Sequence, residues 1–339
     1  MKIEIIKNQK DWAEFLSLVD SYDSYHTYDY HILSKLNDET PILLKYEHLG
    51  VLIGLPFLVR KIENSEYKDL TSVYGYPGPI SKGVTNHFNN AHFKIELIKF
   101  LKLNNFICAF SRLNPFIAKQ LKILINFGTI IPKGKVVNID ITKKTEIQRV
   151  DYQKRLKTYI NKSRRNSSVI KASSKADLKV FIDIYYKNMK RVDADDFYFF
   201  DELYFKNLVD SEDFKTEILL AKDNNTNEIM AGCLFLISNG IVQYHLSGTK
   251  EEFLDQTPTK LLIDEMRVIA TNRNLLFFNL GGGLGGREDD SLFNFKSSFS
   301  KNHKDFNIWK IIIDENIYNN LVIKTKADKN TEYFPIYRS

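Results

Sequence analysis

The glycine-rich segment at residues 280–287 is the first part of the chain that could take part in chemistry. It reads Leu-Gly-Gly-Gly-Leu-Gly-Gly-Arg directly after an apolar stretch. Glycines lack a Cβ atom, so Gly281, Gly282 and Gly283 allow the backbone to approach a bound molecule closely. We interpret the segment, with Arg287, as a substrate-binding loop. The alternative is a surface turn that needs positive φ angles.

The same glycines formally fit the dinucleotide-binding pattern G-x-G-x-x-G through Gly281, Gly283 and Gly286. That use requires a helix that opens at the last glycine, followed by further βαβ units. Here three carboxylates follow at once, at residues 288–290, and they would repel a pyrophosphate. A dinucleotide-dependent enzyme is therefore kept only as a minor alternative.

A lysine stands among aromatic residues just beyond this loop. Lys296 is flanked by Phe293, Phe295 and Phe299. Aromatic surroundings remove water from an ammonium, so its charge acts more strongly on a developing oxyanion, or its pKa falls enough for it to act as a base. The alternative is a surface lysine on an amphipathic turn. We select Lys296 as a catalytic candidate and Phe295 as a binding candidate.

A histidine lies near the end of an expected strand. By an alternation of period two, Gln243, His245 and Ser247 share a polar face, and Tyr244 points to the other face. Imidazole titrates near neutral pH, so His245 is a candidate base for an attacking ammonium, whereas a solvent-facing histidine is the alternative. Tyr244 is a binding candidate. The sequence has no G-x-S-x-G, no HExxH and no other metal-ligand spacing, so we expect no metal site.

Two further segments are candidates for substrate contact. Residues 154–171 hold seven basic side chains and no acidic one, so Arg164, Arg165 and Asn166 are candidates for binding a phosphate group; a solvated helix face is the alternative. The segment Tyr-Gly-Tyr-Pro-Gly-Pro contains two prolines and two glycines that favour a rigid turn. That turn would fix the direction of Tyr74 and Tyr76.

The elements that must position these residues form two similar halves. An apolar hairpin around residues 48–50 resembles a second one in residues 217–249. In the second half a helix follows, where Thr257 can act as the N-cap and Pro258 takes the first helical position. This order predicts an α/β fold with a mixed sheet, divided into domains 1–145 and 146–339.

Composition limits the class of protein. The 339 residues fit two domains, and 43% hydrophobic and 27% charged residues are typical of globular chains. No apolar run approaches a membrane span and the first residues lack a secretory signal, so we expect a cytoplasmic protein. The net charge of +6 argues against DNA coating. The only cysteines, Cys108 and Cys233, lie in apolar runs and do not indicate a disulfide framework.

Taken in order, several of these motifs resemble the FemAB-like acyltransferases, which are built from two tandem GNAT-type domains packed side by side. The motifs are the Tyr-Gly-Tyr-Pro-Gly-Pro turn, the basic helix, Tyr-His-Leu-Ser-Gly-Thr, the helix start at Thr257 and the glycine loop followed by Ser-Leu-Phe-Asn-Phe-Lys-Ser-Ser-Phe. The resemblance covers nearly the whole chain. It is strongest between residues 229 and 299.

The resemblance implies transfer of an acyl group, without a covalent enzyme intermediate, to an amine of a cell-envelope precursor such as a nucleotide- or lipid-linked amino sugar or a peptidoglycan peptide. It implies that Lys296 stabilises the transition state, and that Arg164 and Arg165 contact the acceptor's phosphates. The expected donor is aminoacyl-tRNA or acyl-CoA, with no tightly bound cofactor. Contact with a membrane surface is left open. A GNAT-like module that binds a glycan or nucleotide without turnover is the alternative.

Overall fold

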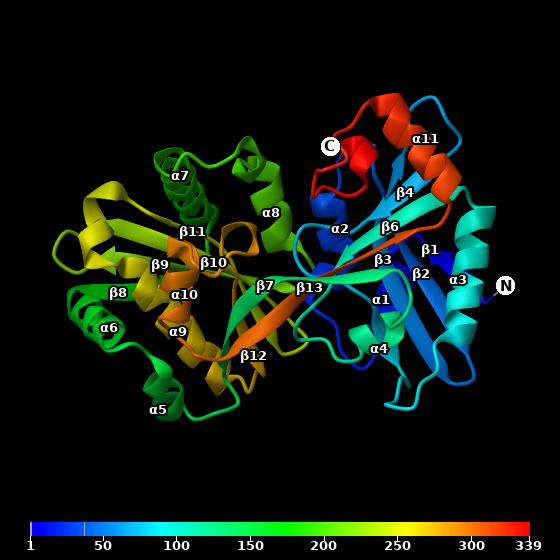
Figure 1. Ribbon diagram of the computed structural model, residues 1–339. Coiled ribbons are helices and arrows are strands. Elements are labelled where there is room, and N and C mark those ends of the chain that lie inside the picture. The colour runs from blue at the N-terminus through cyan, green and yellow to red at the C-terminus, as the bar shows by residue number, and fades with distance from the viewer. Residues whose placement is uncertain (1, 37) are drawn as a thin grey trace. The chain divides into compact units, whose positions relative to one another are not determined.

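The computed structural model describes residues 2–36 and 38–339, and the chain divides into two compact units. Unit 1 comprises Met1–Lys133 together with Asp305–Ser339, and unit 2 comprises Gly134–Lys304. Each unit has a mixed β-sheet with helices on its faces (Figure 1). The expected α/β class with a mixed sheet is confirmed. No helix within the described residues is long and apolar enough to cross a membrane.

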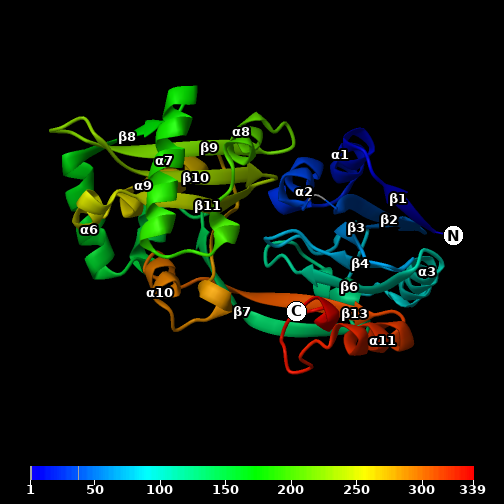
Figure 2. The same cartoon turned by 90° about the horizontal axis from the view of Figure 1, so that it is seen from above.

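The sheet of unit 1 has the strand order β1-β2-β3-β4-β6-β13, which can be followed in Figure 2. All neighbours are antiparallel except β4 and β6, which are parallel. The short strand β5 pairs with β3 beside this path. The strands are β1 (Ile3–Ile6), β2 (Thr40–His48), β3 (Val51–Lys61), β4 (Lys68–Thr71), β5 (Ile80–Lys82), β6 (Phe106–Arg112) and β13 (His303–Ile312).

Helices cover both faces of this sheet. Phe93 and Leu97 of α3 pack with Ile53 and the neighbouring strands in one apolar core. On the opposite face Phe15 of α1 lies against Gly54, where a Cβ atom would be only 2.4 Å from the phenyl ring. Glycine is therefore required where α1 crosses β3. The helices are α1 (Gln9–Leu18), α2 (Tyr28–Ser34), α3 (Ala91–Leu103), α4 (Gln120–Leu124) and α11 (Glu315–Thr325).

The sheet of unit 2 has the order β8-β9-β10-β11-β12-β7, and only β11 and β12 are parallel. This is the same succession of antiparallel and parallel neighbours as in unit 1, so the two halves share one topology. The expected duplication of an α/β unit is present in the fold. The strands are β7 (Thr129–Asp140), β8 (Ser167–Lys171), β9 (Lys215–Asp223), β10 (Ile229–Ser238), β11 (Ile241–Thr249) and β12 (Phe277–Gly281).

The last strand of each sheet comes from the other half of the sequence. In unit 1 β6 pairs with β13, from the end of the chain, whereas in unit 2 β12 pairs with β7, from the end of the first half. The expected domains 1–145 and 146–339 differ from this division. Residues after Asp305 return to unit 1 because β13 completes its sheet, and residues after Gly134 already belong to unit 2 because β7 completes the other sheet.

Unit 2 has α7 and α8 on one face of its sheet and α6 and α9 on the other (Figure 1). Gly232 of β10 lies under Phe181 of α7. The adjacent Cys233 points to the other face, into the core that includes Met266 of α9. Alternation along one strand thus serves both faces. The helices are α5 (Thr145–Gln148), α6 (Lys154–Asn166), α7 (Lys175–Arg191), α8 (Glu202–Asp210), α9 (Pro258–Asn272) and α10 (Ser291–Ser297).

The start of α9 differs from the expected cap. Pro258 takes the first helical position as predicted, but Thr257 has φ +50° and its side chain makes no capping hydrogen bond. Its hydroxyl is buried without a hydrogen-bond partner. The left-handed backbone of Thr257 turns its side chain away from the first free N–H groups, so the cap predicted from residue type does not form.

Candidate active site

The glycine loop follows β12, and side-chain oxygens of two residues accept hydrogen bonds from its backbone. The amide oxygen of Asn279 accepts the N–H of Gly281 at 2.8 Å. A carboxylate oxygen of Asp290 accepts the N–H of Leu284 at 2.6 Å, and its other oxygen caps α10 through the N–H of Phe293. The loop is therefore held at both ends, against β12 and against the start of α10.

Only glycine fits at the centre of this loop. A Cβ atom on Gly282 would lie 2.8 Å from the carbonyl oxygen of Lys135, and one on Gly283 would lie 2.1 Å from both Asp290 and the carbonyl oxygen of Arg287. Gly281 has φ +79°, a left-handed conformation that side chains disfavour. These contacts are made with the protein itself, so the glycines are required for the packing of the loop, and its use as a substrate-binding loop stays a prediction.

The ammonium of Lys296 lies beneath this loop. Its Nζ donates a hydrogen bond to the carbonyl oxygen of Gly282 at 2.8 Å, and the residue is 9% exposed. Loss of hydration lowers the pKa of Lys296 to about 8, opposed by the charge of Asp290. The sequence-based expectation that aromatic neighbours desolvate this lysine agrees with its position beside the buried Phe293.

The backbone N–H groups of the glycine loop differ in their hydrogen bonding. The N–H of Gly281 is taken by Asn279, but within residues 38–339 the structure assigns no protein acceptor to the N–H of Gly282 or Gly283. The N–H of Gly283 belongs to the same trans peptide as the Gly282 carbonyl group, so it points away from the ammonium that this carbonyl binds. The ammonium of Lys296 is the group that burial desolvates, and a desolvated cation stabilises a negative charge that develops on oxygen.

The strands β11 and β12 separate beside the loop. They pair only from Ile241 to Gln243, opposite Phe277 to Asn279. At the last pair the amide of Asn279 donates a hydrogen bond to Gln243 at 2.8 Å, and both side chains are almost fully buried. This bridge fixes the point at which the strands diverge. Sequence reasoning missed both residues, because neither amide stands in a recognisable motif.

A β-bulge places His245 at the same part of β11. Leu234 pairs with Leu246, whereas the next residue, Phe235, pairs with Tyr244, so His245 is an extra residue in the strand. Bulges redirect side chains and are common beside active sites. The predicted alternation is wrong beyond this point, because Ser247 lies on the side of Tyr244 and bonds its hydroxyl at 2.5 Å.

His245 differs from the solvent-facing residue that was the alternative to a catalytic role. Its Nε2 lies 2.9 Å from the hydroxyl of Tyr204 on α8, and the side chain is half-buried. Loss of hydration lowers the pKa of His245 to about 4. The imidazole is therefore neutral near pH 7 and binds a proton only weakly, which limits it as a general base.

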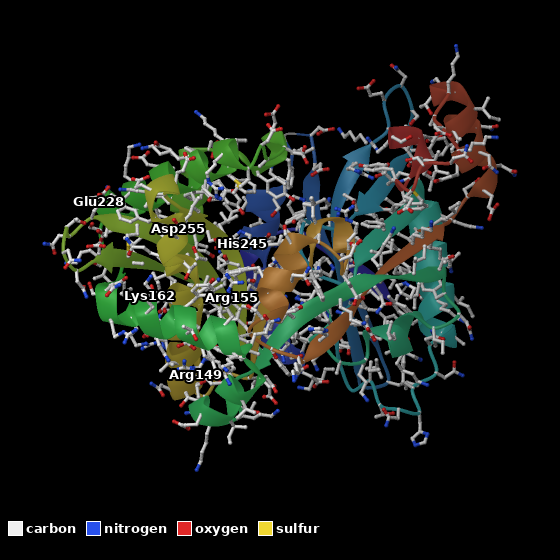
Figure 3. All side chains as sticks on the ribbon, turned by 60° about the vertical axis from the view of Figure 1, so that its left-hand side comes forward. Arg149, Arg155, Lys162, Glu228, His245 and Asp255 are labelled. Atoms are coloured by element: carbon white, nitrogen blue, oxygen red, sulfur yellow. The ribbon has the colours of Figure 1, made fainter. Side chains whose placement is uncertain are left out.

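The basic helix α6 contributes fewer free charges than its sequence indicates. Arg164 forms ion pairs with Asp264 at 2.9 Å and with Glu265, so it fastens α6 to α9. Arg165 and Lys162 are exposed and form no ion pair within 4.0 Å in the described part of the chain. Figure 3 shows Lys162 on α6 and His245 on β11. Arg165 is therefore the freer phosphate candidate of the two arginines.

The remaining binding candidates lie in different surroundings. Asn166 is exposed and its backbone carbonyl accepts the N–H of Asn224 at 2.9 Å. Arg287 is exposed on the glycine loop. Phe295 is half-buried and packs edge-on against Phe299, with ring centroids 5.7 Å apart. Of these, Arg287 and Phe295 belong to the loop and helix that hold Lys296.

Tyr74 and Tyr76 belong to unit 1, where side-chain amides from a later segment of the chain bind the carbonyl oxygens of their turn. Asn114 donates to the carbonyl oxygen of Tyr76 at 2.7 Å. Gln120 donates to the carbonyl oxygens of Pro77 and Pro79 at 3.1 and 2.9 Å. Tyr74 is 48% exposed. The turn is rigid as expected, although its amide supports lie some forty residues away in sequence and were not foreseen.

A metal centre and a dinucleotide site both lack the geometry they need. Among the residues that the structure describes, no group of three or more histidine, cysteine or acidic side chains could hold a metal ion. The last glycine of the loop ends a short 3₁₀ turn, Leu284–Gly286, and α10 begins only at Ser291. No helix therefore opens at Gly286, and the dinucleotide alternative is wrong.

The comparisons with known proteins relate one segment of the chain to a family and the whole chain to a fold. Residues 212–302 match the sequence model of the FemAB family. The crystal structure of FemX is similar with a TM-score of 0.72 at 13% identity, over 94% of this chain and 99% of that one. A conserved protein of unknown function from Bacteroides thetaiotaomicron is similar with a TM-score of 0.58 at 11% identity, over 91% and 99%. No curated protein matches the sequence.

The fold consists of two units of one α/β topology, and the segment that matches the FemAB family indicates an acyltransferase. This FemAB-like segment contains β9 to α10 and therefore Lys296, His245 and the whole glycine loop. The resemblance expected from the sequence motifs is confirmed.

Proposed function

We propose that the protein transfers an acyl or aminoacyl group to an amine of a phosphate-bearing cell-envelope precursor. The observation that carries this proposal is the desolvated ammonium of Lys296, held against the glycine loop by its hydrogen bond to Gly282. Such a constellation suits a reaction in which negative charge appears on a carbonyl oxygen. The FemAB match of the segment that contains it supports an amine acceptor and an envelope precursor.

In the proposed reaction the lone pair of the acceptor amine forms a bond to the acyl carbonyl carbon. The carbonyl electrons move to oxygen, which then carries the negative charge that Lys296 stabilises. When the carbonyl re-forms, the bond to the leaving oxygen of tRNA or sulfur of coenzyme A breaks. The amine loses one proton to water, and the leaving group takes one. No covalent bond to the protein forms.

Lys296 is suited to act as a cation in this step. With a pKa of about 8, about nine in ten of these side chains are protonated near pH 7. Its hydrogen bond to Gly282 fixes the direction of the ammonium, so little reorganisation accompanies the reaction. The base role considered from the sequence fits less well, because a base must be deprotonated at the working pH.

His245 is assigned a supporting role. As a neutral imidazole bonded to Tyr204, it can hold a water or the acceptor amine in place at the bulge of β11. We propose that this water receives the proton of the amine. Substitution of His245 with Gln keeps a hydrogen-bonding group, and we expect a modest fall in rate with an unchanged pH profile. An acidic limb of the rate that disappears in the variant would instead make His245 the base.

The donor and acceptor are distinguished by a direct assay. Purified protein is incubated with aminoacyl-tRNA or acyl-CoA, each with a nucleotide-linked amino-sugar peptide, and products are measured by mass spectrometry. We expect acylated acceptor with one donor class. Thermal stabilisation by the acceptor without product from either donor would favour the binding module.

Arg165 is the proposed phosphate contact, so its substitution with Ala should raise the acceptor's KM.

A further inference from the structure

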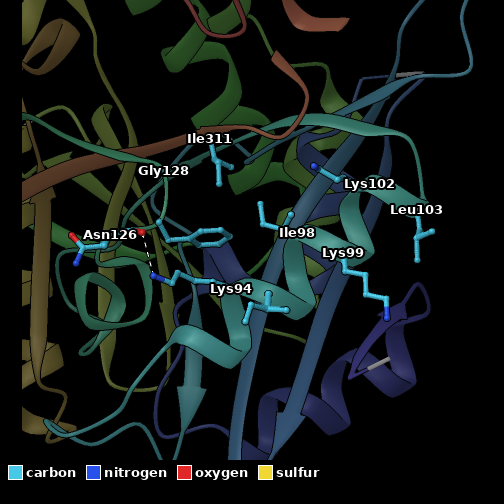
Figure 4. Close-up of a pocket in the computed structure, with 10 residues that line it drawn as sticks. Lys94, Ile98, Lys99, Lys102, Leu103, Asn126, Gly128 and Ile311 are labelled. Carbon is cyan, nitrogen blue, oxygen red and sulfur yellow. Dashed lines mark hydrogen bonds between the residues drawn. The ribbon is translucent and has the colours of Figure 1, made fainter. Parts of the chain in front are cut away.

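An open groove runs along α3 in unit 1, with a volume of about 700 Å³ (Figure 4). It lies outside every residue assigned to acyl transfer above. Its floor is apolar, formed by the buried Phe127 and Ile311. The residues that line it are Lys94, Ile95, Ile98, Lys99, Lys102, Leu103, Asn126, Phe127, Gly128 and Ile311.

The edge of the groove exposes large apolar side chains. Ile95 and Leu103 are each 65% exposed, and Ile98 is partly exposed between them. On an ideal helix these residues and the three lysines fall within about half of the circumference, opposite Phe93 and Leu97, which pack on the sheet. Helix α3 is therefore apolar on both sides, with lysines added only on its outer side.

The lysines of this face form no close ion pairs in the described part of the chain, although the N–H of Lys2 and, to a smaller extent, the charge of Lys99 lower the pKa of Glu96 on the same helix. Within the described residues, Lys94, Lys99 and Lys102 form no ion pair within 4.0 Å, and Lys94 only donates to the carbonyl oxygen of Asn126 at 3.4 Å. Glu96 is the one carboxylate on α3; it accepts the N–H of Lys2 and does not line the groove. The groove thus combines exposed apolar surface with three lysines that have no ion pair within 4.0 Å among the described residues.

We propose that this face of α3 binds an anionic phospholipid bilayer. Ile95 and Leu103 would enter the boundary between headgroups and acyl chains, and the lysines would contact lipid phosphates. A helix face of this composition lies in the plane of a membrane interface, because apolar burial and attraction to anionic lipid act together. The excess of positive charge favours this occupant, since an apolar protein partner would have to bury three ammonium groups.

This inference does not depend on the proposed transfer reaction. Co-sedimentation of the full chain is measured with vesicles of phosphatidylcholine alone and with vesicles that contain phosphatidylglycerol. We expect binding to the anionic vesicles only, weakened as salt is raised, because salt screens charge attraction to the lipid surface. Absence of binding to the anionic vesicles at low salt would overturn the proposal.

A pair of matched variants locates the surface. Lys94→Gln, Lys99→Gln and Lys102→Gln together should weaken binding by about ten- to a hundredfold, from the contribution of each lysine to an anionic surface. Replacing the exposed Lys324, Lys326 and Lys329 with Gln removes the same charge elsewhere on unit 1 and should leave most of the binding. Equal losses in both triple variants, or no loss in the first, would contradict a site on α3.

The apolar part is tested separately. Ile95→Ser combined with Leu103→Ser keeps all three lysines and changes only exposed positions, so the fold should persist. We expect weaker binding to the anionic vesicles and a steeper dependence on salt, since only the charge term is left. Vesicle binding equal to that of the unchanged protein would show that the apolar residues do not enter the bilayer. Dimers that the unchanged protein forms in sedimentation velocity, and that this variant does not form, would assign the face to contact with a second copy of the chain instead.

Discussion

The ammonium of Lys296 donates a hydrogen bond to the carbonyl oxygen of Gly282 across 2.8 Å. This contact joins α10 to the glycine loop and fixes the position of a poorly hydrated cation there. Asn279 and Asp290 hold the two ends of the loop, so the position of Gly282 does not depend on the lysine alone.

Gly281 and Gly285 provide a matched test of the loop. Both have positive φ, +79° and +62°, so alanine carries a similar backbone penalty of ~1 kcal/mol at either position. A methyl group on Gly281 would lie 3.0 Å from the ammonium of Lys296, whereas one on Gly285 meets nothing within 4 Å. We expect Gly281→Ala to lower kcat at least about tenfold and Gly285→Ala to leave it within about twofold. Similar kcat values for the two variants would contradict the claim that the glycine loop is part of the active site.

We expect substitution of Arg164 to lower the stability of the fold, and substitution of Arg165 to weaken binding of the acceptor. Arg164→Ala removes the ion pair to the buried Asp264, which still has Arg267 and Tyr152 as partners, so the free energy of unfolding should fall by about 1–2 kcal/mol. Arg165→Ala should change stability by less than about 0.5 kcal/mol. Urea unfolding measures the first effect and the acceptor's KM the second. A larger loss of stability in Arg165→Ala would contradict the structure.

Much of the fold follows from local patterns, but the exchange of strands does not. The hairpins around Gly50 and in residues 217–249 alternate clearly, and the predicted α9 begins at Pro258. Strand β7 was not predicted. Strand β7 contains Pro132 and Gly134, and its neighbour in the sheet of unit 2, β12, lies far along the chain. Local propensity does not report such pairing.

The candidate site was predictable where chemistry is local. Lys296 was recognisable from its aromatic neighbours and from the glycines before it. The bulge at His245 was not, because a bulge is set by the register against β10 rather than by the residues of β11. The ion pair that occupies Arg164 joins residues one hundred positions apart, so sequence reasoning counted a structural arginine as a free one.

Burial of Lys296 should also appear in the pH dependence of stability. Its pKa is about 8 in the folded chain and 10.5 ordinarily, so between these values the unfolded chain binds more protons and stability rises with pH. Lys296→Met lacks this effect. We expect the variant to be the more stable protein near pH 7, and its advantage to shrink by about 2 kcal/mol towards about pH 9.5. Urea unfolding of both proteins checks this, and an advantage that is constant with pH would mean that the lysine is not desolvated.

The most direct test of the account is the single-turnover rate of acyl transfer in Lys296→Met. The substitution keeps a long apolar side chain and removes the charge, while Lys301→Met alters an exposed lysine of the same unit as the control. We predict a fall of about a hundred- to a thousandfold for Lys296→Met, the effect of removing one well-placed oxyanion donor, with acceptor binding and the control variant unchanged. A rate for Lys296→Met within about twofold of the unchanged protein would contradict the central claim that this ammonium stabilises the transition state.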